Sequence, residues 1–241
     1  MRMVNSILPL SLERVCYEIS GRRLINDLSC TFAAGSRSVI LGPNGAGKSI
    51  TLRLCHGLLR PTSGSVRWLG PAASRAAERQ AMVFQRPVML RRSVAANIAY
   101  ALAVRGVARR LRGEPVAQAL ARVNLAEAAD RPARALSHGE QQRVAIARAW
   151  VLKPEVLFLD EPTANLDPEG TRTVEEAIEA VHRSGAKIIM TTHDLGQARR
   201  LADEVLFLHR GRLVEHTAAE DFFAAPKSRE AAAYLKGELL W

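Results

Sequence analysis

Eight consecutive residues in the first quarter of the chain have the types and the spacing that bind phosphate. They are Gly42-Pro43-Asn44-Gly45-Ala46-Gly47-Lys48-Ser49, and they match the pattern G-x-x-x-x-G-K-[ST] at every fixed position. Glycines let backbone N–H groups curl around an anion without Cβ clashes. We expect Lys48 to reach the β- and γ-phosphates of a bound nucleotide and the Ser49 hydroxyl to bind Mg²⁺.

The flanking residues predict the strand and the helix that such a loop needs. Residues 38–41 form an apolar run typical of a buried strand, and residues 50–56 have the pattern of a helix that ends at Gly57. The start of that helix would add a positive partial charge beside the anion. The alternative is a glycine-rich turn that matches the pattern by chance, and the flanking pattern argues against it.

A second group of chemistry-bearing residues follows the apolar run at 156–159, where the chain continues with Asp160 and Glu161. A buried strand ending in this pair would place two carboxylates at the edge of an open α/β sheet where ligands bind. We expect Asp160 to hold Mg²⁺ and Glu161 to polarise the water that attacks a γ-phosphate. Taken alone, the pair is equally explained as the start of a turn before Pro162.

The third group is the stretch 136–143, Leu-Ser-His-Gly-Glu-Gln-Gln-Arg. Ser137 and Glu140 have the spacing of a capping box ahead of an apolar helix over 140–152. A purely structural role, in which these residues only start a helix, is enough to explain this pattern. A helix N-terminus opened by serine and glycine is also a site for anions, so a functional interpretation uses the same physics.

The elements that must position these residues form an alternating series of strands and helices, which predicts an α/β fold with a mostly parallel sheet. Residues 94–131 are rich in Ala, Leu and Arg at helical spacing, so the block 94–150 is expected to be a helical insertion between two portions of the sheet. The tail, 216–241, is expected to form short helices. The predicted strands are 10–17 and 24–33, on either side of a turn at Gly21, and then 66–69, 187–191 and 204–208.

Composition sets wide bounds on the protein class. The 241 residues are 48% apolar and 24% charged, as in an ordinary globular protein of one α/β domain. The net charge of +10 suits a nucleic acid, an anionic membrane surface or a merely solvated basic face. The three scattered cysteines predict reduced thiols in a cytosolic protein. No apolar run approaches the roughly 18 to 20 residues that cross a bilayer, and the first ten residues do not resemble a signal peptide.

The whole chain resembles the ATP-binding subunits of ABC transporters. The resemblance rests on the order and spacing of six elements: the phosphate loop at 42–49, Gln85, the signature segment at 136–140, the Asp-Glu strand at 156–161, Asn165-Leu166-Asp167 and His193. It implies a P-loop NTPase fold with a mostly parallel central sheet, an N-terminal antiparallel β subdomain and an inserted helical subdomain. It also implies a single domain over 1–241. The nucleotide-binding core would take residues 1–93 and 151–215, the helical subdomain 94–150 and a helical tail 216–241.

The resemblance also assigns roles to residues that patterning alone does not single out. ATP and Mg²⁺ would be bound along the whole phosphate loop and at Ile50, which stands where a threonine is usual. Gln85 would contact Mg²⁺ and the attacking water and lie in the groove facing the membrane subunit. His193 would touch the γ-phosphate, and Tyr17 would stack on adenine. Without the family these three residues would be interpreted as a surface glutamine, a helix-start residue and a strand aromatic.

In this family two subunits sandwich two ATP molecules, and each signature segment serves the nucleotide of its partner. Ser137, His138 and Gly139 would therefore act in trans, and Asp167 would help to join the two sites. Glu140 would belong to the same nucleotide-binding segment, as a familiar variant of the usual glutamine. The usual segment is Leu-Ser-Gly-Gly-Gln, so His138 adds bulk where backbone approaches phosphate. That side chain would either slow closure of the sandwich or donate a hydrogen bond, and the sequence leaves the sign open.

The favoured function is a transport motor, an ATP hydrolase that drives a transmembrane permease subunit. Residues 84–92 and 222–226 are similar to those of importers for oxyanions such as tungstate, molybdate or phosphate. This implies a homodimer in the ATP-bound state, a solute-binding protein, a peripheral position on the cytoplasmic face of the inner membrane, and no appended regulatory domain. Nucleic acid is not expected as a partner.

Two alternatives stay open at this point. An exporter ATPase for a drug or lipid would carry the same catalytic residues. A nucleic-acid-remodelling ATPase of the same superfamily is permitted by the net charge, but such proteins usually carry a coiled-coil insertion, zinc cysteines or a second ATP site, and none is visible in the sequence. A nucleotide-binding module without catalysis is disfavoured because Lys48, Asp160 and Glu161 are all present.

Overall fold

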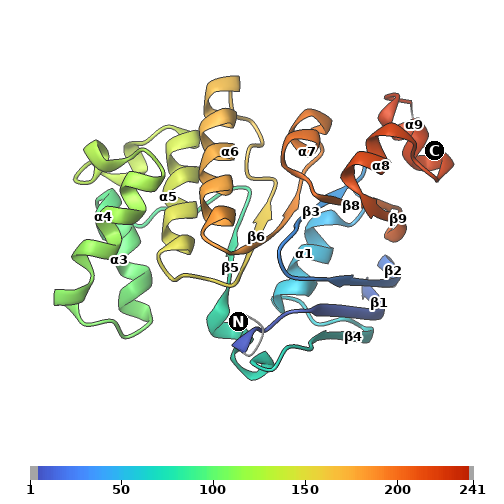
Figure 1. Cartoon of the computed structure of the whole chain (residues 1–241), viewed down its shortest axis with the longest axis horizontal. Helices are drawn as coiled ribbons and strands as arrows, with labels where there is room; N and C mark the ends of the chain where they lie inside the picture. The colour runs from blue at the N-terminus through green and yellow to red at the C-terminus, as the bar shows by residue number, and fades with distance from the viewer. Residues whose placement is uncertain (1–4, 239–241) are drawn as a thin grey trace.

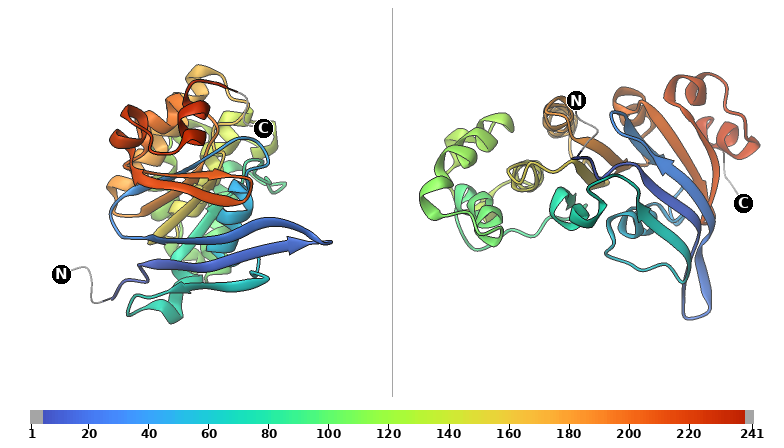
Figure 2. Two further views of the ribbon diagram at one scale, coloured as in Figure 1. Left: turned by 90° about the vertical axis from the view of Figure 1, so that its right-hand side faces the viewer. Right: turned by 60° about the horizontal axis from the view of Figure 1, so that its bottom comes forward.

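A computed structural model describes residues 5–238 as two β-sheets surrounded by helices, which confirms the predicted α/β fold (Figure 1). The first four residues and the last three residues of the predicted tail lie outside the described range. The antiparallel sheet lies towards one end of the molecule, and the helices α3, α4 and α5 form the other end (Figures 1 and 2).

The smaller sheet has three antiparallel strands in the order β2-β1-β4. Leu10 pairs with Phe32 at one end of the β1–β2 hairpin and Ile19 with Arg22 at the other, and the turn passes through Gly21 at φ 76°. The predicted hairpin is therefore confirmed, with a first strand two residues longer than expected. The strands of this sheet are β1 (Leu10–Ile19), β2 (Arg22–Phe32) and β4 (Ser63–Trp68).

The larger sheet has six strands in the order β5-β6-β7-β3-β8-β9, and every neighbouring pair is parallel except β8 and β9. Its central strands are continuous apolar runs because helices or the other sheet cover both of its faces. The carboxyl ends of β3, β6 and β7 lie at one edge, which receives the predicted site residues. The strands are β5 (Gln80–Val83), β6 (Val156–Asp160), β7 (Lys187–Thr191), β3 (Arg37–Leu41), β8 (Glu204–His209) and β9 (Arg212–Ala218).

Helices connect the parallel strands and build the block at the far end of the molecule. Helix α5 packs against α3, α4 and α6, so it joins the helical block to the sheet. The α-helices are α1 (Lys48–His56), α2 (Ala76–Arg79), α3 (Val94–Val104), α4 (Gly113–Arg122), α5 (His138–Trp150), α6 (Pro168–Arg183), α7 (Leu195–Leu201), α8 (Ala219–Ala224) and α9 (Arg229–Leu235).

Two hydrophobic clusters flank the larger sheet, and alternate residues of one strand enter each cluster. In β6, Leu157 and Leu159 face the cluster that contains α3, α5 and α6, whereas Val156 and Phe158 face the cluster formed with α1 and the smaller sheet. All four are fully buried. Each such side chain contributes about 1.5–3 kcal/mol through burial, so β6 and its terminal carboxylates are held in a rigid frame.

Several boundaries differ from the sequence-based expectations, and the strands β5 and β9 were not predicted. Strand β4 begins at Ser63 rather than at residue 66, and α5 spans His138–Trp150 rather than 140–152. Helix α1 begins at Lys48 rather than at residue 50, because Gly47 takes a left-handed conformation as N-cap and the helix starts directly after it. Residues 216–218 belong to strand β9, so the prediction that the helical tail begins at 216 is wrong at its first three positions. Strand β9 was missed because its mixed polar sequence has no apolar run, and it forms through a turn at Arg210 and Gly211 back onto β8. The division into subdomains stays a prediction.

Candidate nucleotide-binding and hydrolysis site

The phosphate loop lies between β3 and α1, and two of its glycines are enforced by close neighbours. A Cβ on Gly42 would overlap the carbonyl oxygen of Leu208, and a Cβ on Gly47 would lie 2.7 Å from the Ile25 side chain. Gly47 also has φ 102°, a conformation that L side chains rarely adopt. The loop backbone therefore packs closely against β2 and β8. This packing holds the loop in the curled conformation in which its N–H groups can surround an anion.

Lys48 is the first residue of α1, and its ammonium is folded back into the loop. Its Nζ donates to the carbonyl oxygens of Gly42 at 2.9 Å and Pro43 at 3.3 Å, and it lies 3.7 Å from Glu161 Oε1. Burial lowers the pKa of Lys48, while Glu161 and Asp160 act in the opposite direction. The side chain thus places a positive charge inside the concave side of the loop.

Asp160, at the end of β6, is held by donors from two other elements. Its Oδ1 accepts hydrogen bonds from Ser49 Oγ at 2.6 Å and from Thr191 Oγ1 at 2.9 Å. Its Oδ2 lies 3.6 Å from a guanidinium nitrogen of Arg53 in α1. The structure therefore brings together two of the three residues predicted to bind Mg²⁺, Ser49 and Asp160.

Glu161 follows Asp160 and leaves the strand with φ 45°, so its side chain takes a different direction from that of its neighbour. Its backbone N–H donates to Thr191 Oγ1 at 3.0 Å. Its Oε2 accepts from His193 Nδ1 at 3.0 Å, and the His193 side chain is 53% exposed. The carboxylate of Glu161 is thus shared between Lys48 and His193, at the mouth of the phosphate loop.

Gln85 follows β5 of the larger sheet, whereas Tyr17 lies on β1 of the smaller sheet. Val83 of β5 pairs with Leu159 of β6, so Gln85 and Glu161 each lie two residues beyond the paired positions at the same edge of the sheet. Tyr17 is partly buried on β1 and packs against the cluster that contains Ala46 of the phosphate loop. Their side chains make no hydrogen bond within residues 5–238, so their predicted contacts to ligand stay predictions.

The signature segment lies apart from this site. Ser137 caps α5 by the predicted capping box, in which its Oγ accepts from Glu140 N at 3.3 Å and Glu140 Oε2 accepts from Ser137 N at 2.8 Å. Although burial works against the carboxylate, the hydrogen bonds from Ser137 lower the pKa of Glu140. The exposed His138 and the half-buried Gly139 line a cavity of about 420 Å³ with Asn165, Leu166 and Asp167, and no phosphate-loop residue lines it.

The comparisons with known proteins agree with this geometry. Residues 25–164, more than half of the chain, match the sequence profile of the family described as ABC transporter. The chain belongs to the ABC transporter family. Like the ATP-binding subunits of that family, this ABC ATPase binds and hydrolyses ATP.

Several import proteins are similar to this ABC ATPase over most of its length. The phosphate import ATP-binding protein PstB 2 of Natronomonas pharaonis is 36% identical over 249 residues, covering 96% of this chain and 88% of that protein. The tungstate uptake system ATP-binding protein TupC of Peptoclostridium acidaminophilum is 41% identical over 204 residues, covering 84% and 94%. The Fe(3+) ions import ATP-binding protein FbpC of Pasteurella multocida is 36% identical over 224 residues, but the match covers only 64% of that protein.

Solved structures have the same fold. The protein cbiO1 from Clostridium perfringens, part of the ABC transporter complex cbiONQ, matches with a TM-score of 0.80 and 29% identity, covering 95% of each chain. An ATP-binding subunit of an ABC transporter matches with a TM-score of 0.79 over 95% of this ABC ATPase and all of that chain, at 23% identity. The second similarity supports the fold alone.

The residues of the site fit a magnesium nucleotide. Ser49 Oγ and the buried carboxylate of Asp160 converge within 2.6 Å of each other, and oxygen donors of this kind are what Mg²⁺ prefers. The close packing of Leu208 and Ile25 against Gly42 and Gly47 leaves no room for a Cβ at either glycine, so the loop backbone can curl tightly there. Both features serve an anion with a bound divalent cation.

Three residues at this site were missed by the sequence reasoning. Thr191 bonds both acidic residues, and the sequence signal available was its place at the end of an apolar strand, where parallel strands present ligand-binding groups. Arg53 faces Asp160 one helical turn after Ser49, which the helix spacing alone could indicate. Tyr234 in α9 places its hydroxyl 3.5 Å from the Gly42 carbonyl and 3.4 Å from the His193 carbonyl, and no sequence pattern pointed to that contact.

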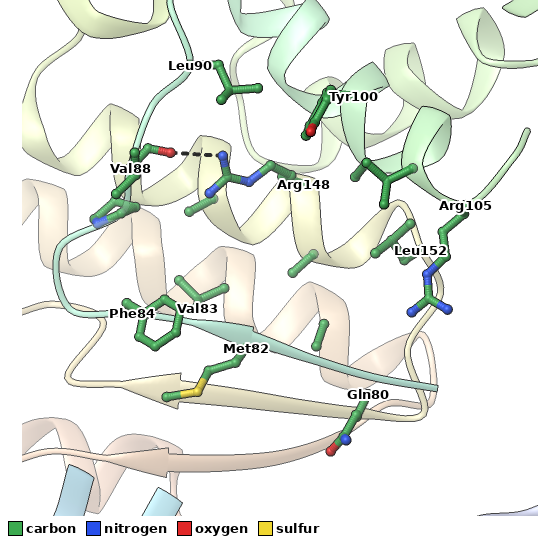
Figure 3. A pocket seen from close by; sticks show the side chains of 16 residues that line it. Gln80, Met82, Val83, Phe84, Val88, Leu90, Tyr100, Arg105, Arg148 and Leu152 are labelled. Carbon is green, nitrogen blue, oxygen red and sulfur yellow. Dashed lines mark hydrogen bonds between the residues drawn. The ribbon is translucent and has the colours of Figure 1, made fainter. Parts of the chain in front are cut away.

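An apolar groove of about 440 Å³ opens beside Gln85, between β5, α3 and α5 (Figure 3). Phe84, Val88 and Tyr100 line it while keeping substantial exposure to solvent. Arg148 of α5 donates to the Val88 carbonyl at 3.0 Å, which connects the segment after β5 to the helical block.

None of the helices within residues 5–238 has the length and apolarity to cross a bilayer.

Proposed function

We propose that this ABC ATPase powers the uptake of an oxyanion such as tungstate, molybdate or phosphate through a separate membrane subunit. The observation that carries the proposal is the similarity to named import proteins over nearly the whole chain, at 41% identity to a tungstate uptake protein and 36% to a phosphate import protein. It agrees with the importer-like sequences at 84–92 and 222–226.

The first step of the proposed mechanism is binding of the triphosphate. Loop N–H groups and the Lys48 ammonium would bind the β- and γ-phosphates, so Lys48 would exchange its bonds to the Gly42 and Pro43 carbonyls for bonds to phosphate. Ser49, Asp160 and Gln85 would hold Mg²⁺, which offsets charge on the β- and γ-oxygens. Tyr17 would stack on adenine, and Ile50 would support the loop from the first turn of α1.

Glu161 is the proposed general base. Its carboxylate would take a proton from water as the water oxygen attacks the γ-phosphorus and the bond to the leaving ADP breaks. His193 already donates to this carboxylate and would orient it, and on closure would also contact the γ-phosphate. Because both residues follow the buried ends of β6 and β7, their backbones are fixed before the nucleotide arrives.

The proposed site would be completed by a second copy of the chain. Ser137, His138, Gly139 and Glu140 line a cavity with Asp167 that contains no phosphate-loop residue, so one chain does not bring them to its own nucleotide. We infer that two copies face each other with ATP between them, the start of α5 in one copy directed at the γ-phosphate bound by the other. Hydrolysis would remove that shared ligand and release the two copies.

The apolar groove of Figure 3 is the proposed dock for a cytoplasmic helix of the membrane subunit. Exposed Phe84, Val88 and Val104 offer an apolar surface that a partner helix would bury. Residues on both sides of Gln85 line the groove, so movement of the docked helix would shift Gln85 relative to the bound nucleotide. With a helix docked there, the chain would lie peripherally on the cytoplasmic face of the membrane.

The test is reconstitution of this chain with a candidate membrane subunit and a solute-binding protein. We expect the two to co-purify, and we expect ATP hydrolysis in proteoliposomes to rise when the binding protein is loaded with tungstate, molybdate or phosphate. Lys48→Ala in the same complex supplies the background rate. Stimulation by none of these anions would reject the oxyanion, and failure to assemble with any membrane subunit would reject the transport role.

A further inference from the structure

Most of the net positive charge of the protein arises in one stretch of the sequence. Residues 84–152 contain twelve arginines, no lysine and four carboxylates, a net charge of +8 out of +10 for the whole chain. This stretch includes α3, α4 and α5 and the borders of the apolar groove. ATP hydrolysis does not explain that concentration, because the proposed site residues in this stretch, Gln85 and residues 137–140, include no arginine.

Arginines are most closely spaced in the turn between α3 and α4. We call this segment the basic turn and define it as residues 104–112. It contains Arg105, Arg109, Arg110 and Arg112 and no acidic residue. Arg105 donates to the Ala77 carbonyl, and Arg112 donates to a carbonyl within the turn itself. No carboxylate within residues 5–238 forms an ion pair with any of the four arginines, so their charge is not neutralised inside the chain.

Apolar side chains stand exposed among these arginines. Val104 is 68% and Leu111 is 58% exposed, while Arg109 and Arg110 beside Leu111 are exposed as well. Cationic and apolar groups side by side match the lipid interface, where the headgroups take the charge and the acyl boundary takes the apolar atoms. A nucleic acid backbone offers the phosphates without such a layer, so it leaves Leu111 and Val104 unexplained.

The basic turn borders the proposed docking groove. Val104 and Arg105 belong to the turn and also line the groove, and Arg105 stands at its edge in Figure 3. A membrane subunit seated in the groove would bring the turn close to the bilayer, and this step rests on the proposed function. We propose that the basic turn binds anionic phospholipid headgroups of the adjoining leaflet, with Arg109 and Arg110 on the phosphates and Leu111 in the interface.

The experiment is flotation of the purified full chain with vesicles of phosphatidylglycerol and phosphatidylcholine, or of phosphatidylcholine alone, without any membrane subunit. We expect binding only to the anionic vesicles, weakening as salt rises. An arginine at an anionic surface contributes roughly fivefold in partitioning, so Arg109→Ala/Arg110→Ala should weaken binding by about 30-fold. Leu111→Ala should weaken it several-fold.

The matched control removes the same charge from the opposite end of the molecule. Arg22 and Arg23 are adjacent, exposed and placed at the start of β2, far from α3 and α4 (Figure 1). Arg22→Ala/Arg23→Ala should change vesicle binding less than twofold. Thermal unfolding of both double variants should match that of the wild type, since all four side chains are on the surface.

Equal binding to both vesicle types, equal losses in the two double variants, or an undiminished Arg109→Ala/Arg110→Ala chain would each overturn the proposal. So would binding of a DNA or RNA duplex through Arg109 and Arg110 with no binding to vesicles. The outcome is separable from the proposed function. A chain that ignores lipid but shows anion-stimulated hydrolysis with its membrane subunit refutes the lipid surface alone, and one that binds lipid but assembles with no membrane subunit refutes the transport role.

Discussion

Replacing Thr191 with valine would test whether one buried hydroxyl holds both acidic residues of the site. The hydroxyl of Thr191 donates to Asp160 Oδ1 at 2.9 Å and accepts from the backbone N–H of Glu161 at 3.0 Å. The side chain is fully buried at the end of β7. Valine has nearly the same shape, so the substitution removes these two hydrogen bonds and adds little strain.

The expected loss in the free energy of unfolding depends on the partner of each hydrogen bond. A hydrogen bond to a charged carboxylate is worth about 1.5–3 kcal/mol. The second bond costs less, because the Glu161 N–H keeps a partner in the Thr191 carbonyl at 3.2 Å. We therefore expect Thr191→Val to lower the free energy of unfolding by about 2 kcal/mol, which corresponds to roughly 4–8 °C in Tm for a chain of this size. If the same loss is expressed in the transition state, kcat/KM for ATP falls by up to about 30-fold.

Thermal unfolding and steady-state ATP hydrolysis measure these two effects. The matched control is Thr51→Val in α1, because Thr51 is equally buried and its hydroxyl has no hydrogen-bond partner within residues 5–238. That variant should be as stable as the wild type or more stable, since it removes a buried unpaired hydroxyl. A Thr191→Val protein with unchanged Tm and unchanged kcat/KM would refute the idea that this hydroxyl organises the acid pair.

Other substitutions probe the remaining roles. Glu161→Gln should lower the hydrolysis rate by about 10²–10⁴-fold while ATP binding persists and a dimer accumulates on size-exclusion chromatography, and near-normal turnover would exclude Glu161 as the base. Lys48→Ala should abolish nucleotide binding in a fluorescent-nucleotide titration, and retained tight binding would contradict the phosphate loop assignment. Glu204 is paired with the buried Lys187 at 3.0 Å, and although burial works against its carboxylate, its hydrogen bonds and Lys187 hold its pKa far below the usual 4.5. A carboxyl pKa lowered by folding stabilises the protein above its unfolded pKa, so stability should fall as pH drops below about 4.5. Chemical denaturation should show that slope reduced in Lys187→Met/Glu204→Gln, and an identical slope would assign acid sensitivity to other groups.

The sequence predicted the architecture well where local patterns and long-range packing agree. The apolar runs at 156–159 and 187–191 became β6 and β7 at almost the predicted positions, because strands covered on both faces must be apolar throughout. The capping box of Ser137 and Glu140 formed as expected, since all of its partners lie within four residues. The phosphate loop likewise carries its own backbone requirements in its glycines.

The sequence did not predict features that depend on contacts between residues far apart in the chain. Strand β9 has too little apolar character to be identified alone, and it exists because β8 offers it a pairing edge. Thr191, Arg53 and Tyr234 reach the site from elements far apart in the sequence, so no local spacing reveals their contacts. The separation of the phosphate loop from the signature segment is also a property of the fold, and it is the reason that a second copy of the chain enters the proposed mechanism.

A crystal structure of the Glu161→Gln chain with Mg²⁺ and ATP would show where the triphosphate lies relative to the two acidic residues. We expect two copies of the chain around two nucleotides. Each triphosphate should lie between Lys48 of one copy and Ser137 and Gly139 of the other, with residue 161 facing the γ-phosphate. An empty phosphate loop, or a bound nucleotide whose terminal phosphate lies away from residues 160 and 161, would contradict this expectation.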